Sequence, residues 1–334
     1  MTQRVRGSGH AGAVVDRNPG AFDRISPDDR PEGSRQRVTA VVWSAAWEAG
    51  RRLPEALVYA IADGIARVLY RVSGSTRERV ARNLRRVVDT DDVDRTVRDA
   101  FRSYARYWVE AFRAADIAPA DIDARTTTVG LHHLDNALDG GRGVIVLLAH
   151  HGSWDTAARW AETHNYHLAV VAEVVRPRAL FRKFVGLREA IGLEVVPLQR
   201  GTTMTARLGE VAQANHLVGL LTDRDLTGKA PVVGFFGEDA RIPLGPVVVS
   251  RRTGAPIVPI TMLQRPGRRW ELHVRPAIDI EGLEMAQASQ RVAQNLEALI
   301  RTAPEQWHAF QPVWLADLPV SKRGDWRAPQ DRAG

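Results

Sequence analysis

The feature that most constrains the fold is an alternation of short apolar runs with helical segments from Gly143 onward. Apolar runs bounded by polar or glycine-containing stretches are typical of buried strands. Helical segments between such runs are typical of the crossover connections of an α/β sheet. The expected strands are 144–148, 168–172, 193–198, 217–222, 235–237, 256–262 and 270–274. The expected helices are 153–163, 178–191, 203–215 and 285–301. The sequence therefore predicts an α/β fold, with a central mixed sheet and flanking helices.

The region before the sheet has helical periodicity instead. Apolar residues recur there at every third or fourth position, which predicts amphipathic helices. These residues are Val58, Ile61, Ile65, Val68, Val72, Val80, Leu84 and Val87. A further helix is expected over 96–113. Between residues 37 and 88 the chain has ten arginines and four acidic residues. Trp43 and Trp47, four positions apart, suit either a membrane interface or a packing face within the protein, and the sequence leaves both open.

Composition also predicts the domain boundaries. Residues 1–36 are rich in Gly, Pro, Asp, Arg and Ser without apolar periodicity, so we expect a disordered leader. Residues 37–318 form one predicted domain, in which 37–118 is the basic, amphipathic and membrane-associating part and 119–318 is the α/β core. Residues 319–334 are expected to be a polar tail.

The composition excludes several classes of protein. The chain has no cysteine, which excludes disulfides, a thiolate nucleophile, iron–sulfur clusters and cysteine zinc sites. No apolar run approaches the ~18 residues that span a bilayer, and the first thirty residues lack the apolar stretch of a signal peptide. We therefore expect the protein in the cytosol or on the inner face of a membrane. The net charge of +7 predicts an anionic partner. No zinc-finger or RNA-binding motif supports nucleic acid as that partner.

The strongest polar cluster is the segment 149–155 (AHHGSWD), directly after the expected strand 144–148. Open α/β sheets bind their ligands at this end of the strands. Gly152 permits a tight turn, and Asp155 falls in the first turn of the next helix, so its carboxylate could point back to His150. In such a pair the imidazole is a general base and the carboxylate orients it. Common nucleophile, phosphate-loop and metalloprotease motifs are absent from the sequence.

Two other functions remain open. A metal-dependent hydrolase could use His150, His151 and Asp155, although successive side chains of an extended segment point in opposite directions. Alternatively, the basic helices could act as a membrane adaptor without enzymatic activity. His151 could also compete with His150 as the base.

His150, four intervening residues and Asp155 resemble the H-x₄-[D/E] signature of the glycerolipid and lipid A acyltransferase superfamily. The similarity is closer to its phosphatidylinositol mannoside acyltransferases from actinobacteria, and it extends from about residue 40 to residue 318. The further matching segments are 103–108 (SYARYW), 130–135 (GLHHLD), 187–192 (LREAIG), 223–227 (DRDLT), 235–238 (FFGE) and 307–318 (WHAFQPVWLADL).

The resemblance implies transfer of a fatty acyl chain, typically palmitoyl, from acyl-CoA to the 6-hydroxyl of a mannose in phosphatidylinositol mannosides. It implies that His150 deprotonates this hydroxyl and that Asp155 orients His150, without an acyl-enzyme. Glu173, Arg188 and Asp223 are implied to bind the substrates. Asp223 stands where the family usually has Glu, which is one methylene longer.

The same resemblance implies the partners and the location of the protein. The expected partners are acyl-CoA, as co-substrate rather than cofactor, an anionic glycolipid and the inner membrane surface. No metal and no nucleic acid is expected. The expected location is the cytoplasmic face of the cell membrane, where the protein would be peripheral.

Overall fold

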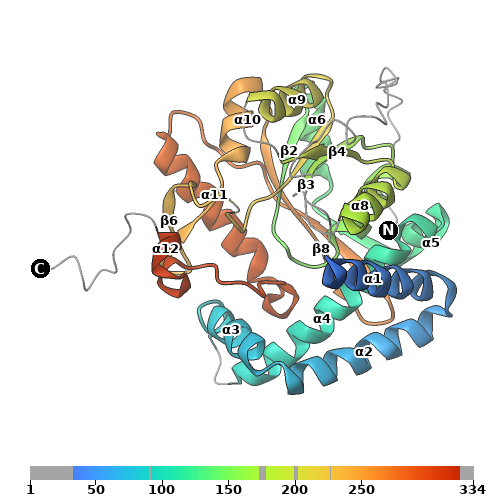
Figure 1. Ribbon diagram of the computed structural model, residues 1–334. Coiled ribbons are helices and arrows are strands. Elements are labelled where there is room, and N and C mark those ends of the chain that lie inside the picture. The colour runs from blue at the N-terminus through green and yellow to red at the C-terminus, as the bar shows by residue number, and fades with distance from the viewer. Residues whose placement is uncertain (1–32, 90–91, 173–177, 199–201, 226, 324–334) are drawn as a thin grey trace, which may run out of the picture.

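The computed structural model describes residues 33–89, 92–172, 178–198, 202–225 and 227–323 (Figure 1). A seven-stranded mixed sheet has the order β1-β9-β8-β2-β5-β3-β4. Its strands are β1 (Thr126–Val129), β2 (Val144–Leu148), β3 (Leu168–Ala172), β4 (Glu194–Pro197), β5 (Leu217–Leu221), β8 (Ile257–Arg265) and β9 (Arg269–Val274). The β8–β9 pair is antiparallel and the other neighbours are parallel. The predicted α/β fold with a mixed central sheet is confirmed.

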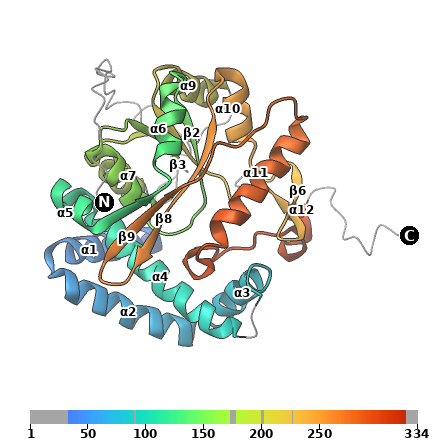
Figure 2. The same ribbon diagram turned by 180° about the vertical axis from the view of Figure 1, so that it is seen from behind.

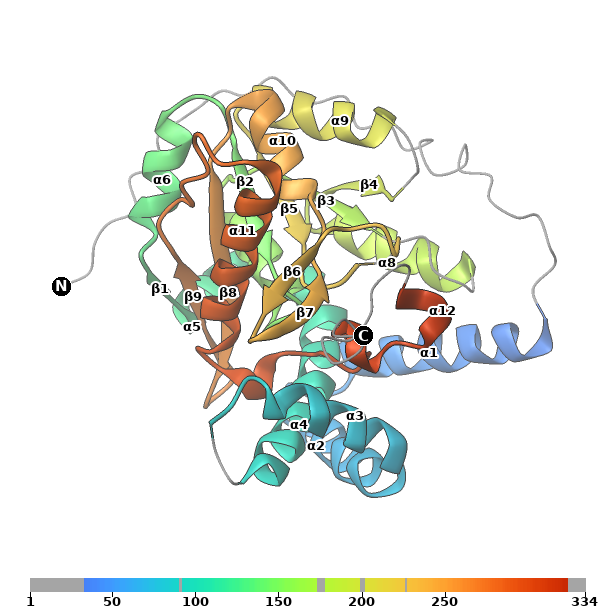
Figure 3. The ribbon, with the colours of Figure 1, turned by 90° about the vertical axis from the view of Figure 1, so that its left-hand side faces the viewer.

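The alternation of side chains along β2 explains the layers. Ile145 and Leu147 are buried on one face, against the helices α9 (Thr202–Gln213), α10 (Gly245–Thr253) and α11 (Met285–Ile300). Val144 and Val146 are buried on the other face, against α5 (Pro119–Arg125), α6 (His132–Asp139) and α7 (Trp154–Thr163). Since β2 is buried on both faces, it reads as a continuous apolar run in the sequence. Figure 3 shows α11 against the sheet beside β8.

One expected strand does not join this sheet. The segment expected as strand 235–237 instead ends β6 (Val232–Phe235), which pairs antiparallel with β7 (Glu238–Arg241) in a separate two-stranded sheet. Phe236 and Gly237 have φ of 48° and 82°. Two consecutive positive φ values make the tight turn of a hairpin, which ends the strand. The prediction was therefore wrong for this segment. The short polar strand β1 was not expected.

The N-terminal helices gather on the side of the molecule opposite α9 and α10 (Figures 1 and 2). They are α1 (Ser34–Arg52), α2 (Glu55–Val72), α3 (Gly74–Arg85) and α4 (Val93–Arg113). Trp43 and Trp47 of α1 contact the rings of Phe112 on α4 and Phe184 on α8 (Arg178–Ala190). The structure thus supports the packing interpretation of these two tryptophans. No helix in the described ranges is both long and apolar enough to cross a bilayer.

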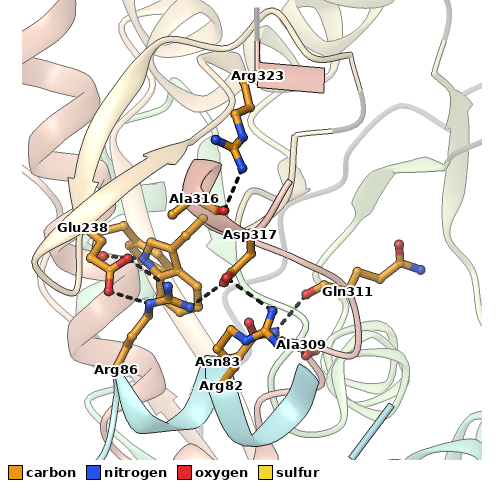
Figure 4. Close-up of polar contacts among 11 residues, drawn as sticks. Arg82, Asn83, Arg86, Glu238, Ala309, Gln311, Ala316, Asp317 and Arg323 are labelled. Atoms are coloured by element: carbon orange, nitrogen blue, oxygen red, sulfur yellow. Dashed lines mark hydrogen bonds and ion pairs between the residues drawn. The ribbon is translucent and has the colours of Figure 1, made fainter. Parts of the chain in front are cut away.

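The helix α3 holds the C-terminal segment in place (Figure 4). The Asn83 amide donates to two backbone carbonyls in the segment 309–311, at 2.8 and 2.9 Å. The Arg86 guanidinium donates to both carboxylate oxygens of Glu238, at 2.7 and 2.8 Å, and also binds Asp317. Bidentate pairs of this kind fix geometry as well as charge. Since 309–311 lines the large cavity described below, α3 supports one wall of that cavity.

The boundaries of the predicted domain parts stay a prediction. Residues 1–32 of the expected leader and residues 324–334 of the expected tail lie outside the described ranges, and α1 begins at Ser34. The helix α12 (Val320–Arg323) lies at the start of the expected tail.

Candidate active site

The loop 149–153 follows β2 and is held by the C-terminal segment. The Gly152 N–H donates to the Gln306 carbonyl at 3.0 Å, and the His308 N–H donates to the His150 carbonyl at 2.7 Å. The chain around 306–308 therefore runs beside the loop like a short antiparallel partner. These backbone bonds fix His150 at the carboxyl end of the central strand, where α/β sheets place their sites.

The His150 side chain pairs with Asp223, which follows β5. The distance between His150 Nδ1 and Asp223 Oδ1 is 2.8 Å, and the His150 backbone N–H donates to the same oxygen at 3.0 Å. Burial would raise the pKa of the Asp223 carboxyl, but the His150 charge and the hydrogen bonds from His150 and Trp307 lower it to about 2. Asp223 is therefore an anion throughout the physiological range, held against the imidazole.

The predicted contact between Asp155 and His150 is wrong. The Asp155 carboxylate instead accepts the Tyr107 hydroxyl at 2.7 Å and the Arg188 Nε–H at 3.0 Å. Asp155 does lie in the first turn of α7, as expected, but there its carboxylate meets α4 and α8. Asp223 reaches His150 because β5 is the direct neighbour of β2, which brings the carboxyl ends of the two strands together.

A cavity of about 770 Å³ is lined by the four candidate residues that the structure describes, namely His150, Asp155, Arg188 and Asp223. Its volume is within the usual range for small-molecule sites. The rest of its lining is mainly apolar and comes from both the sheet and the helices. This lining includes Leu148, Leu168, Val170, Phe181, Leu208, Leu220 and Val249. The fifth candidate, Glu173, lies outside the described residues.

Comparison with known proteins identifies the family. Residues 33–316 match the family described as bacterial lipid A biosynthesis acyltransferase. The chain belongs to this acyltransferase family. A phosphatidylinositol mannoside acyltransferase of Mycolicibacterium smegmatis is 36% identical over 291 residues, covering 86% of this chain and 95% of that protein. A protein of the same name from Mycobacterium tuberculosis is 35% identical over 308 residues, covering 90% and 96%. The resemblance drawn from the sequence is confirmed.

The second histidine of this acyltransferase's loop has a different environment. His151 is 2% exposed, and its ring nitrogens lie 2.9 Å from the Thr261 hydroxyl and 2.9 Å from the Ala303 carbonyl. Burial lowers the pKa of His151 to about 4, so the ring stays neutral near pH 7. His150, His151 and Asp155 therefore turn to separate partners and do not converge as one ligand set. This geometry disfavours both His151 as the base and the metal-site interpretation.

Three further residues of the site carry no role in the sequence analysis. Tyr107 binds Asp155, and Trp307 donates from Nε1 to Asp223 Oδ2 at 2.8 Å. His308 lines the cavity, and burial lowers its pKa well below 6.5. All three lie in segments that carry the family resemblance. The family resemblance indicated these segments, but it did not indicate which of their side chains line the site.

Proposed function

We propose that this acyltransferase moves a palmitoyl chain from acyl-CoA to the 6-hydroxyl of a mannose in phosphatidylinositol mannosides. The observation that carries the proposal is the His150–Asp223 pair on the wall of a mainly apolar cavity of about 770 Å³. Such a cavity suits an alkyl chain, because apolar surface is removed from water on binding. The names of the two relatives support a phosphatidylinositol mannoside as the acceptor, whereas palmitoyl-CoA as the donor and the 6-hydroxyl as the site are implied by the family resemblance.

The His150–Asp223 contact fixes which nitrogen acts as the base. An ionised carboxylate only accepts hydrogen bonds, so Nδ1 carries the proton in this contact and Nε2 has a lone pair. Nε2 takes the proton of the mannose hydroxyl, and the imidazolium that forms is stabilised by Asp223. The sequence led us to expect that Asp155 is the carboxylate that orients His150. We assign this role to Asp223 instead.

The remaining steps need no acyl-enzyme. The sugar oxygen attacks the thioester carbonyl carbon and forms a C–O bond, and the carbonyl π electrons move to the oxygen. When this tetrahedral intermediate collapses, the C–S bond breaks and the CoA sulfur takes the proton from His150. Acyl-CoA is a co-substrate, and the proposal requires no other cofactor and no metal.

The predicted substrate contacts are assigned separately. Arg188 lines the cavity and uses its Nε–H on Asp155, so its other N–H groups are the donors we assign to the polar acceptor. Asp155 holds the guanidinium in this position, and the Tyr107 hydroxyl holds Asp155. Glu173 stays a predicted substrate contact. Asp223 contacts the acceptor only through His150 in this scheme, which differs from the direct binding role that the resemblance implied.

We further propose that α2 binds the cytoplasmic face of the cell membrane. Its outward side carries apolar residues between 43% and 71% exposed. They are Leu57, Ile61, Ile65, Val68, Leu69 and Val72. Arg67 and Arg71 lie on the same helix and would add about 1 kcal/mol each near an anionic surface. The proposed acceptor is itself an anionic lipid of the membrane. Binding of α2 to the membrane would therefore bring the enzyme to its acceptor.

The membrane proposal is tested by flotation with vesicles that contain phosphatidylinositol. Ile61→Ser with Ile65→Ser should weaken binding by at least ~10-fold, because each change removes a large apolar contact. The control is Val129→Ser with Val232→Ser, whose side chains are 49% and 40% exposed elsewhere on the surface. Equal binding by the two double variants would refute the assignment of α2.

The reaction is tested with purified protein, radiolabelled palmitoyl-CoA and phosphatidylinositol mannosides in detergent. The wild type should form labelled glycolipid, whereas His150→Ala should form it at least ~100-fold more slowly while still binding vesicles. A wild-type protein that binds vesicles but never labels the lipid would refute the transferase and favour the adaptor alternative.

A further inference from the structure

A buried indole holds the carboxylate partner of His150. Trp307 is 1% exposed, and its Nε1–H donates to Asp223 Oδ2 at 2.8 Å. The other oxygen of Asp223 accepts both bonds from His150. Both oxygens of the carboxylate are therefore occupied, and its plane is fixed by donors from two different segments of the chain.

The indole itself is fixed in the core. The Trp307 ring lies 6.1 Å from Phe235, 6.2 Å from Phe236 and 5.9 Å from Trp314, measured between ring centroids. Its backbone belongs to the segment that runs beside the loop of His150. The indole therefore cannot follow the carboxylate if the carboxylate rotates, and it acts as a fixed donor.

We propose that Trp307 is a positioning residue for acyl transfer, whose indole N–H sets the orientation of Asp223 and thereby that of the His150 imidazole. The inference rests on the proposed function for its effect on the reaction rate. An indole suits this task because its N–H only donates and does not titrate in the physiological range, so the contact is the same at any working pH.

Three other titratable groups around the pair do not take over this task. His151 and His308 are buried and neutral, with pKa values lowered by burial to about 4 and to well below 6.5. The carboxylate of Asp155 is paired with Arg188. Arg224 and Asp225 also line the cavity near the pair. In the described structure Trp307 is the group that donates to Asp223 Oδ2.

The test removes the indole N–H and leaves a smaller aromatic ring in its place. Trp307→Phe removes the donor to Asp223. The matched control is Trp314→Phe, because Trp314 is fully buried in the same aromatic cluster and its Nε1–H donates to the Phe235 carbonyl at 2.8 Å. Both variants lose one buried indole donor, so both should lose a similar amount of stability. They differ in the acceptor of the lost hydrogen bond, which is the site residue Asp223 for Trp307 and the Phe235 carbonyl for Trp314.

In the transfer assay we expect Trp307→Phe to lower kcat by at least ~10-fold, as for loss of a hydrogen bond to a charged group, with KM for acyl-CoA changed less than about threefold. Trp314→Phe should keep kcat within about threefold of the wild type at a temperature where both are folded. Equal kcat values for the two variants, or a rise in KM alone, would overturn the positioning role.

A second readout does not depend on activity. The His150 Nδ1–H proton, identified by the loss of its signal in His150→Ala, is followed by NMR at one fixed pH. In Trp307→Phe this signal should move, because the carboxylate that accepts the Nδ1–H bond has lost the donor that holds its plane. In Trp314→Phe the signal should stay at its wild-type position. A His150 signal unchanged by Trp307→Phe overturns the inference, even if the wild type transfers no acyl chain.

If Trp307→Phe does not fold, Asp223→Asn tests the same contact from its other end. This substitution keeps the shape of the acceptor and removes its charge, so the indole N–H signal of Trp307 should move upfield while that of Trp314 stays in place. Two indole signals that both stay in place would contradict the inference.

Discussion

The two faces of the loop 149–153 differ in what surrounds them. On the cavity face, the His150 side chain is 30% exposed and bound to the Asp223 carboxylate. On the core face, His151 is 2% exposed and bound between Thr261 of β8 and the Ala303 carbonyl. The two histidines are consecutive residues of an extended segment, so their side chains point in opposite directions.

In the proposed mechanism, one short loop therefore provides both the base and its own anchor. The proposed base, His150, has to reach the substrate, which agrees with its partial exposure. It must also be held in position, which the buried histidine and the backbone bonds to 306–308 accomplish. Substitutions on the cavity face should therefore change the rate, and those on the core face should change stability.

The largest expected effect is on the cavity face. His150→Ala should lower kcat by roughly 10²- to 10⁴-fold, the usual contribution of a general base. Its unfolding free energy should fall by about 1–2 kcal/mol, less than for the core-face change below, because the buried Asp223 carboxylate loses its hydrogen bond from the imidazole. Kinetics and urea denaturation of the same preparation measure both quantities. If His150→Ala lost as much stability as a variant of the core face, the distinction between the two faces would be removed.

The core face should show its largest effect at Gly152. Its φ is 66°, and a Cβ placed there would lie 2.0 Å from the Met262 carbonyl oxygen of β8. Gly152→Ala should therefore cost about 4 kcal/mol of stability, from backbone strain and forced displacement of the loop.

Gly141→Ala is the matched control for this change. Gly141 has a φ of 68° with open space around the added Cβ, so only the strain of about 1 kcal/mol remains. Urea unfolding compares the two variants. Similar losses of stability would mean that contact with β8 does not anchor the loop.

The two carboxylates of the site, Asp223 and Asp155, should also differ in what their substitution changes. Asp223→Asn should lower kcat by about 100-fold, because the imidazolium loses its counter-charge. Asp155→Asn should lower stability by about 3 kcal/mol and raise KM for the acceptor more than it lowers kcat, because it leaves the Arg188 charge without the partner that positions it. Kinetics and unfolding are measured for both. If Asp155→Asn lost activity with full stability while Asp223→Asn kept its kcat, the original assignment from the sequence would be restored.

The smallest effect concerns pH. Since the pKa of His151 falls from about 6.5 in the unfolded chain to about 4 in the folded protein, protons bind the unfolded chain first as the pH falls. The associated stability is complete above pH 6.5 and is lost between about pH 6.5 and 4. At pH 5 the loss is about 2 kcal/mol.

This linkage is measured by urea unfolding at pH 7 and pH 5. The wild type should lose about 2 kcal/mol more than His151→Gln between these two values, because the glutamine side chain does not titrate. The same pH dependence in both proteins would show that His151 is already charged or exposed.

Local patterns predicted much of the sheet, but not the pairing within the site. The apolar runs gave β2 and β3 with their observed bounds, because each run is short and is bounded by polar or glycine-containing stretches. The hairpin β6–β7 was missed, since a turn at Phe236 with positive φ has no strong local signal. The partner of His150 was also missed. Asp155 is five residues away, whereas Asp223 is 73 residues away, and only the neighbouring positions of β2 and β5 bring it close.

The path of the acyl chain shows whether a sugar hydroxyl attacks the thioester directly. Protein is mixed with isotopically labelled palmitoyl-CoA, with and without phosphatidylinositol mannosides, and both protein and lipids are analysed by mass spectrometry. With acceptor present, the label should appear on the 6-oxygen of a mannose, with free CoA as the other product. Without acceptor, the label should remain on CoA and the protein should stay unmodified. Label bound covalently to the protein, or released only as free fatty acid, would contradict direct attack by a sugar hydroxyl that His150 deprotonates.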